Sequence, residues 1–500
     1  MNRSAWRQLG LLLAVALAAR LGAGLYWQAR LDRQHARFEF GDSQSYWTLA
    51  RAIAECRPYR YGPEEAQIFR TPGYPLLLAP LFRITQGDPP VIWARVESAV
   101  FGTLAVGGVW WLARELFDAR AGLIAGAVAA FYPGAVAISV LVLSEAPFCP
   151  LMLLQLALWT VAWKADPPRR AAVPALLAGV VAGAATLVRP SWLLFTPFAV
   201  VVGLVVRGQG ARPNSRSPSP SHDRTPRDAA RGRENPADVP DSSLVQKPLT
   251  PGPSPRKRGE RRTFRDRHSA ISNQHSAFRI SPSPRPSPQG RGRDAWIGLA
   301  MLAGLILTMI PWWTRNARVC GRFVPTTLQV GASLYDGLNP QATGASNMDL
   351  VPEPVEKLRQ RAAGGEVPRD AALEVELDRR FRAAARAFAR ENPASVARLA
   401  AVKLLRTWNV WPNEPSFAAW PIRLAVLLSY VPVLVLGILG AAGTIRRGWP
   451  YVLCWLPAVY FTLLHVIFAS SIRYRQPAML GLMVLAAGAV GSWRRSAKGE

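Results

Sequence analysis

Two carboxylates in this 500-residue chain lie at the edges of apolar segments, where they could act on a substrate held at a membrane surface. Asp42 occurs in GDSQSYWTLA, shortly after the first apolar block, and Glu145 occurs in LSEAPF. A carboxylate in such a place could deprotonate the hydroxyl or amine of an acceptor. Asp42 also fits a simpler role, because Asp is favoured as a helix N-cap and residues 43–54 are predicted to be helical. From the local sequence alone, the cap is the favoured interpretation.

Several arginines flank the same apolar segments. Each could simply extend its charged head to the membrane surface. Ionisable residues at membrane depth are costly, however, and they tend to face a cavity or a partner. Together the arginines and acids suggest a site for an anionic head group, because guanidinium matches phosphate oxygens in geometry and charge. The residues singled out besides the two carboxylates are Glu39, Arg70, Tyr74, Arg95, Arg189, Arg315, Arg473, Tyr474 and Arg475.

The composition makes an ordinary soluble enzyme a poor interpretation. Half of the residues are hydrophobic, and they cluster in blocks long enough to cross a bilayer as helices. A formal charge of +28 would suggest nucleic-acid binding in a soluble protein. Here the basic residues separate apolar blocks, so membrane topology explains them better and no nucleic-acid partner is expected. Four cysteines without a C-x-x-C pair exclude a zinc ribbon and a disulfide scaffold.

The blocks predict an all-α integral membrane protein with about ten spans. The first block, 6–27, could be a signal peptide, but no good cleavage site follows and Tyr26-Trp27 resembles an interfacial belt, so we expect an uncleaved anchor. Segment 71–84 is short and Pro-rich, which favours an interfacial or re-entrant helix. The other predicted spans are 91–113, 121–138, 143–163, 171–188, 191–206, 295–314, 421–443, 449–469 and 476–492.

The short basic loops predict the orientation. If ten spans alternate, these loops all fall on one side, which the positive-inside rule makes cytoplasmic. We therefore expect a multi-pass protein of the plasma (inner) membrane with both termini cytoplasmic, and with loops 28–90 and 315–420 extracytoplasmic. Apolar residues recur at helical spacing from about 370 and again over 394–409. These helices could lie on the membrane or pack as a small external domain.

Residues 207–293 differ from the rest of the chain. They contain 19 Lys and Arg, 7 Asp and Glu and 14 prolines, with few aliphatic residues. Such a stretch cannot bury enough surface to offset its ordering entropy, so we predict a disordered cytoplasmic insert. It could bind anionic lipid or RNA, but a tolerated insertion is favoured. The predicted organisation is an N-terminal membrane module 1–206, the insert, a membrane helix 294–314, the external region 315–420 and a C-terminal membrane module 421–500.

The order and spacing of several segments resemble the GT-C superfamily of polytopic glycosyltransferases. The closest branch is bacterial proteins related to protein O-mannosyltransferases and lipid A aminoarabinose transferases. The resemblance covers roughly 1–206 and 295–492. The matching segments are GDSQSYWTLA, FRTPGYPLLLAPLF, ARVESAVFGTL, LSEAPF, LVRPSW, PWWTRNARVCGRFV and HVIFASSIRYRQPAMLGLMVLA.

The resemblance implies transfer of a sugar from a polyprenyl-phosphate donor to an acceptor on the outer face of the bilayer. The acceptor class stays open between protein, glycolipid and cell-envelope polymer. Asp42 matches the family's first-loop acid, Arg95 the arginine near the start of the following span, and Glu145 the carboxylate heading a later span. Many relatives carry adjacent Asp-Glu in the first loop, whereas Asp42 is followed by Ser43, which leaves a two-acid site and a divalent metal undecided.

The implied roles form three groups. Asp42 and Glu145 are expected to be catalytic. The remaining residues would bind the donor phosphate (Arg95, Arg189, Arg473 and Arg475) or other parts of the substrates (Glu39, Arg70, Tyr74, Arg315 and Tyr474).

Two other functions remain as alternatives. A transporter or lipid flippase should place ionisable residues near mid-membrane and often has an internal repeat, and neither feature is expected here. A non-enzymatic assembly protein could use the insert as a docking tail. Walker, GxSxG and HExxH motifs are missing from the sequence, so ATP-driven transport and common hydrolase chemistry have no support.

Overall fold

The computed structural model describes residues 3–62, 66–210, 288–347, 371–412, 417 and 419–497. Helix α9 (Phe195–Gly210) ends and helix α10 (Pro288–Cys320) begins at the borders of the gap, so most of the predicted insert lies outside the described residues. Apart from one isolated bridge between Tyr61 and Ala66, the described residues contain no β-structure. They form an all-α protein, as the sequence predicted.

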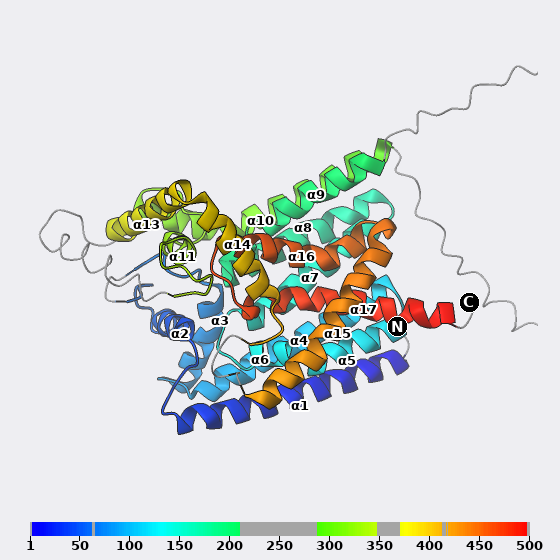
Figure 1. Ribbon diagram of the computed structural model, residues 1–500, viewed down its shortest axis with the longest axis horizontal. Coiled ribbons are helices and arrows are strands. Elements are labelled where there is room, and N and C mark those ends of the chain that lie inside the picture. The colour runs from blue at the N-terminus through cyan, green and yellow to red at the C-terminus, as the bar shows by residue number, and fades with distance from the viewer. Residues whose placement is uncertain are drawn as a thin grey trace, which may run out of the picture. The chain divides into compact units, whose positions relative to one another are not determined.

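Helices of very different length make up this fold (Figure 1). Besides α9 and α10, they are α1 (Arg3–Arg33), α2 (Gly41–Ala54), α3 (Gly73–Thr85), α4 (Val91–Leu116), α5 (Ala119–Phe131), α6 (Pro133–Ile138), α7 (Glu145–Lys164), α8 (Ala172–Val188), α11 (Val330–Gly337), α13 (Ala371–Glu391), α14 (Pro393–Trp408), α15 (Trp420–Thr444), α16 (Trp449–Ile467) and α17 (Ile472–Ala497).

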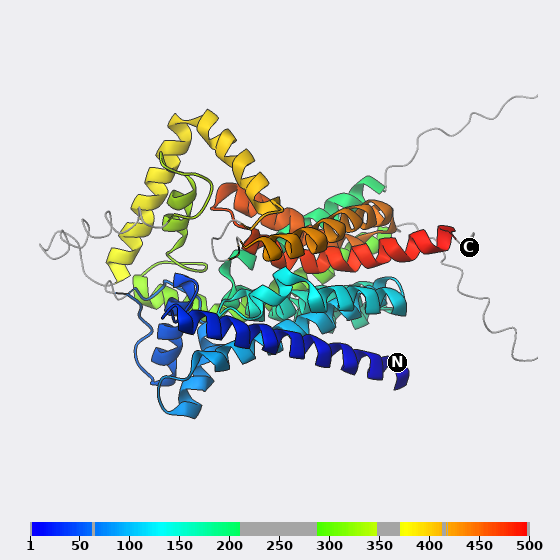
Figure 2. The ribbon, with the colours of Figure 1, turned by 60° about the horizontal axis from the view of Figure 1, so that its bottom comes forward.

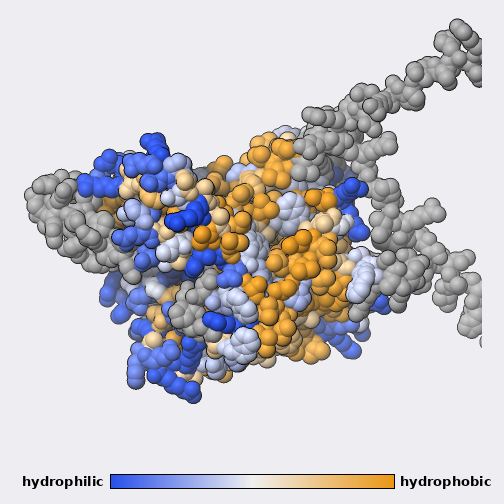
Figure 3. All heavy atoms as spheres, in the orientation of Figure 1, coloured by the Kyte–Doolittle hydropathy of each residue, from blue (hydrophilic) through white to orange (hydrophobic). Residues whose placement is uncertain are grey.

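Eight helices of the described chain are long and apolar enough to cross a membrane, namely α1, α4, α7, α8, α10, α15, α16 and α17. Two further predicted spans correspond to shorter apolar helices, Ala119–Phe131 and Pro190–Val205. Segment 71–84 forms α3, whose 13 residues are too few for a span, as predicted. Apolar side chains gather over the long helices, and polar ones gather near α2 and α13 (Figure 3).

The loops sort to opposite ends of the helix bundle. The start of α1 and the end of α17 lie at one end, and α2, α3, α11 and α13 lie at the other (Figure 1). The two loop regions predicted to share a side therefore do so. Figure 2 shows α13 and α14 meeting at an apex, from which α14 returns to the bundle.

Helices α13 and α14 pack against the protein. Helix α13 buries Leu373 and Phe381, and the Phe381 ring lies 5.5 Å from that of Tyr335 in α11. Helix α14 packs on α16 and α17 but leaves Leu404 and Leu405 exposed. Helix α13 therefore packs on other parts of the protein through its apolar face.

A proline divides one predicted span. Segment 121–138 forms α5 and α6, because Pro133 has no N–H to donate to the carbonyl of Ala129. Arg20, midway along α1, replaces that donor: its guanidinium donates to the carbonyl oxygens of Ala129 and Ala130, both at 3.0 Å. The expectation of no ionisable residue near the middle of a span was therefore wrong. Arg20 nevertheless gives no support to a transport pathway, since it is 1% exposed and donates hydrogen bonds to backbone carbonyls.

Helices α8 and α10 approach each other through glycines. A Cβ atom on Gly179 would overlap the carbonyl oxygen of Met301, and one on Gly304 would overlap that of Leu176. These positions allow the two backbones to pack closely, as small residues do between membrane helices.

Gly179→Ala is therefore expected to destabilise the protein by roughly 1–3 kcal/mol, because the clash is with backbone and cannot be relieved by a rotamer change. The measurement is the midpoint of thermal unfolding in detergent. Gly22→Ala in α1 is the control, since a Cβ there meets nothing within 4 Å. Equal midpoints for the two variants would contradict the close approach of α8 and α10.

Candidate active site

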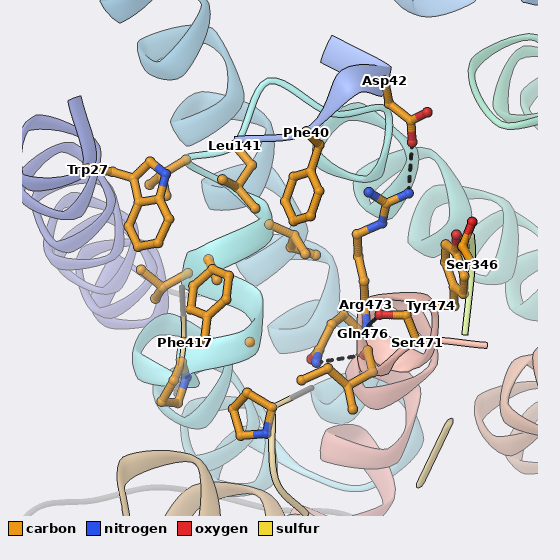
Figure 4. Close-up of a pocket in the computed structure, with 18 of the residues that line it drawn as sticks. Trp27, Phe40, Asp42, Leu141, Ser346, Phe417, Ser471, Arg473, Tyr474 and Gln476 are labelled. Atoms are coloured by element: carbon orange, nitrogen blue, oxygen red, sulfur yellow. Dashed lines mark hydrogen bonds and ion pairs between the residues drawn. The ribbon is translucent and has the colours of Figure 1, made fainter. Parts of the chain in front are cut away.

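A cavity of about 850 Å³ lies where α1, α2, α6, α15 and α17 converge. Figure 4 shows its two contrasting sides: Asp42 and Arg473 lie on one, and Trp27 and Phe417 lie on the other. The apolar side continues along Phe131, Ile422 and Val426. The cavity thus joins a charged site to an apolar wall.

Asp42 lies between two arginines. Its Oδ1 is 2.6 Å from the guanidinium of Arg70, and its Oδ2 is 3.0 Å from that of Arg473. Arg70 also donates to the hydroxyl of Ser45 at 3.1 Å. The Asp42 side chain is 33% exposed and lines the cavity, so a substrate could reach it.

Arg473 also binds a second carboxylate. Its Nε is 2.9 Å from Oε1 of Glu145, and Arg189 approaches the same oxygen at 3.0 Å. The Glu145 side chain is 1% exposed and, like Arg189, lies outside the cavity lining. Arg70, Asp42, Arg473, Glu145 and Arg189 form one continuous chain of charges, which we call the charge chain. It has one more positive than negative charge.

Helix termini explain part of this arrangement. Asp42 lies in the first turn of α2 and Glu145 in the first turn of α7, where the helix dipole favours a negative charge. Arg473 lies in the first turn of α17, where the same effect disfavours a positive charge. The two carboxylates compensate it. The N-cap of α2 is Phe40, so the interpretation of Asp42 as a helix cap was wrong.

The arginines determine the protonation of Asp42. Burial alone would raise its pKa, but Arg70 and Arg473 hold the pKa of the carboxyl well below its usual range. The pairing therefore stabilises the folded chain at all pH values above the usual aspartate range and is lost only in strong acid. Asp42 is a carboxylate under any physiological condition.

An aromatic stack supports Arg473. The Tyr474 ring stacks on the His465 ring with centroids 4.2 Å apart, and the guanidinium of Arg473 lies 5.1 Å from the Tyr474 centroid. His465 is buried, and its Nδ1 is 2.9 Å from the carbonyl oxygen of Ala469. The segment HVIFASSIRYRQ offered a signal for His465, but no role was assigned to it.

Besides Arg189, two more of the arginines predicted to bind phosphate lie apart from the cavity lining, namely Arg95 and Arg475. Arg95 donates to Gln28 at 2.9 Å and to the carbonyl oxygen of Val140 at 2.7 Å. Arg475 donates to the carbonyl of Thr407 at 2.9 Å and covers the Tyr430 ring. Both are at most 2% exposed.

Three other predicted residues also lie outside the lining. Glu39 is half-buried. Tyr74 is fully buried, with its ring 5.0 Å from that of Tyr46. The Arg315 guanidinium lies over the rings of Tyr59 and Trp312. Of the predicted set, the structure brings Asp42, Arg70, Arg473 and Tyr474 to the cavity.

Sequence reasoning missed other cavity residues, among them Ser45, Arg406 and Gln476. Ser45 could have been found from its spacing to Asp42 on one helix face. Arg406 had no distinguishing signal, because α13 and α14 contain many arginines. Within the described ranges, no group of three or more His, Cys, Asp or Glu side chains could hold a metal ion.

Glu145→Gln should destabilise the protein strongly, because it leaves Arg189 and Arg473 buried with one carboxylate fewer. Breaking a buried ion pair typically costs about 3–5 kcal/mol. Glu115→Gln is the matched control, since the Glu115–Lys164 pair is about 40% exposed on both sides and should contribute about 1 kcal/mol or less. Thermal unfolding in detergent compares them, and equal midpoints would show that the charge chain adds no stability.

Sequence comparison identifies one family. The model for dolichyl-phosphate-mannose-protein mannosyltransferases matches residues 70–220. This stretch includes Arg70, Glu145 and Arg189. A comparison with curated proteins found no match.

Structural comparison covers nearly the whole chain. The archaeal oligosaccharyltransferase AglB from Archaeoglobus fulgidus, in complex with an inhibitory peptide and a dolichol-phosphate, matches with a TM-score of 0.52 and 13% identity over 99% of this chain and 52% of that chain. The apo form of the A. fulgidus oligosaccharyltransferase matches with a TM-score of 0.51 and 13% identity, over 99% of this chain and 51% of that chain. ArnT from Cupriavidus metallidurans bound to undecaprenyl phosphate matches with a TM-score of 0.38 and 15% identity, over 99% of this chain and 80% of that chain.

This chain spans about half the length of the oligosaccharyltransferase that it matches. The match extends over 99% of this chain, so it includes the helices that carry the charge chain. The chain therefore shares its helical fold with the A. fulgidus oligosaccharyltransferase.

Proposed function

We propose that this protein transfers a sugar from a polyprenyl-phosphate donor to an acceptor on the extracytoplasmic face of the membrane. The observation that supports this most directly is the cavity, which joins a positively charged site to an apolar wall. A polyprenyl-phosphate sugar has the same two parts, an anionic head and an apolar tail. The relatives whose names mention dolichol or dolichyl phosphate agree with such a donor.

The apolar wall suits the prenyl tail. Trp27 and Phe417 stack with ring centroids 5.0 Å apart, and Ile422 and Val426 of α15 extend the wall. Tyr26 and Phe131 line the cavity and are more than 60% exposed, on the apolar helices α1 and α5. A tail can therefore enter from the membrane between α1 and α15.

The charged side suits the phosphate. Arg70 and Arg473 line the cavity with planar donors that match phosphate oxygens. In the transfer, the acceptor oxygen or nitrogen attacks the anomeric carbon, and the bond from that carbon to the phosphate oxygen breaks. The phosphate leaves with the electron pair, and the arginines beside it stabilise the negative charge that develops there.

Asp42 takes the proton of the acceptor. In the resting site it is a weak base, because two guanidinium groups hold its pKa low. A donor phosphate competes for these guanidinium groups. Once Arg473 turns toward the phosphate, the pKa of Asp42 rises and the carboxylate becomes a better base. Glu145 remains paired with the Nε of Arg473, so it positions this arginine.

Asp42→Asn tests this mechanism. The variant keeps the size of the side chain at a position that is 33% exposed, so the protein should still fold and insert, with a smaller loss of stability than Glu145→Gln, while turnover falls by roughly 10²–10⁴-fold. Mass spectrometry of glycolipids and glycoproteins compares a deletion strain complemented with each form.

Asp118→Asn is the matched control. Asp118 is a true N-cap, accepting from the backbone N–H of Ala121 at 2.8 Å, and Asn caps about as well as Asp. Glu39→Gln is a second control, with a smaller effect expected than at Asp42. A folded Asp42→Asn protein that restores the normal products would remove Asp42 from the mechanism and direct attention to Glu145.

Labelling of Cys56 tests on which side of the membrane the cavity lies. It is exposed just after α2, at the end of the bundle that holds the cavity, whereas Cys149 and Cys454 are buried. A membrane-impermeant maleimide should label intact cells, and Cys56→Ser should remove most of the label. Cys320 is partly exposed, so the comparison is made in a Cys320→Ser background. Labelling that requires permeabilised cells would reverse the proposed orientation.

A further inference from the structure

Arg406 is a cavity arginine with no ion-pair partner among the described residues. It lies on α14 and lines the cavity, and its Nε is buried without a hydrogen-bond acceptor in the described structure. It forms no ion pair with any described acid, whereas Arg70 and Arg473 both bind Asp42. The Nε atoms of Arg189 and Arg473 also lack a hydrogen-bond acceptor, but both of these residues form ion pairs with described acids. A cavity arginine without such a pair needs an explanation.

The position of Arg406 is fixed by its helix. Lys403, one turn earlier, donates to the carbonyl oxygen of Ile467 at 2.7 Å. The hydroxyl of Thr407, the next residue, is 3.0 Å from that of Ser470. These contacts tie α14 to the loop that precedes α17. The backbone of Arg406 is thus held beside the same loop that positions Arg473.

The charges lining the cavity are unbalanced. Among the described lining residues, Arg70, Arg406 and Arg473 are cationic and Asp42 is the one acid, which leaves two excess positive charges. A phosphodiester of the proposed donor supplies one negative charge. One positive charge then remains unmatched.

We propose that Arg406 binds a second anionic group, a phosphate or a carboxylate, that occupies the cavity together with the donor phosphate. This inference rests on the proposed function and narrows its substrate class. The guanidinium offers a planar pair of donors that fits either group. A donor sugar with a cationic amine has no unpaired carboxylate to bind among the described lining residues.

Isothermal titration calorimetry of the full-length protein in nanodiscs of zwitterionic lipid tests the proposal. The probes are undecaprenyl phosphate and inorganic phosphate. The wild-type protein, saturated with undecaprenyl phosphate, should still bind inorganic phosphate. Arg406→Gln should weaken this second binding by roughly tenfold or more, as expected for loss of a charge-assisted hydrogen bond, and leave the lipid affinity unchanged.

Arg398→Gln is the matched control, because Arg398 is exposed on the same helix and does not line the cavity. It should bind both probes like the wild type. Thermal unfolding of both variants shows whether α14 remains packed.

A third probe, undecaprenyl diphosphate, distinguishes the source of the second charge. If it displaces inorganic phosphate, the donor itself supplies both charges. If inorganic phosphate still binds beside it, the second charge comes from the acceptor or the sugar. Both results support a second anion site at Arg406.

Two results would overturn the proposal: Arg406→Gln binding inorganic phosphate as tightly as the wild type, or no binding of inorganic phosphate to the lipid-saturated wild type. Failure of the proposed function looks different, since the wild type would then not bind undecaprenyl phosphate at all. In that case, titration of inorganic phosphate without lipid still compares the wild type with Arg406→Gln and decides whether Arg406 binds an anion.

Discussion

The contact of Arg473 with two carboxylates holds the charged side of the cavity together. This arginine joins Asp42 of α2 to Glu145 of α7 from the start of α17, so three distant parts of the chain meet at one guanidinium. The arrangement needs both acids, because the first turn of a helix is an unfavourable place for a cation. Asp42, Glu145 and the ring of Tyr474 all contact this arginine, and the cavity leaves it accessible.

The arginines inside the bundle serve two different purposes. Arg20, Arg95 and Arg475 donate to backbone carbonyls at helix ends or in connecting segments. In a membrane these carbonyls have no water to bind, so a fixed donor allows the chain to break a helix there. Arg473 and Arg406 instead line the cavity. The irregular segments that shape the cavity thus depend on arginines that lie outside its lining.

Much of the fold could be predicted from the sequence, because span length, helical spacing and loop charge are local properties. The sequence analysis missed the division of 121–138 at Pro133, because an apolar segment with one proline is still long and apolar enough to be predicted as a span. Asp42 and Arg473 could be placed at the same end of the bundle. Their pairing could not be predicted, because they are 431 positions apart and packing determines the contact. Arg95 and Arg473 look alike in sequence, and only their neighbours distinguish them.

Under the proposed function, the pairing of Asp42 with two arginines also affects the stability of a sugar donor in the cavity. Water can enter the same space as an acceptor, and a free carboxylate would activate it for attack. Two guanidinium groups make Asp42 a poor base toward water as well. A site built this way limits wasteful hydrolysis, because basicity develops only when the ions around the carboxylate rearrange.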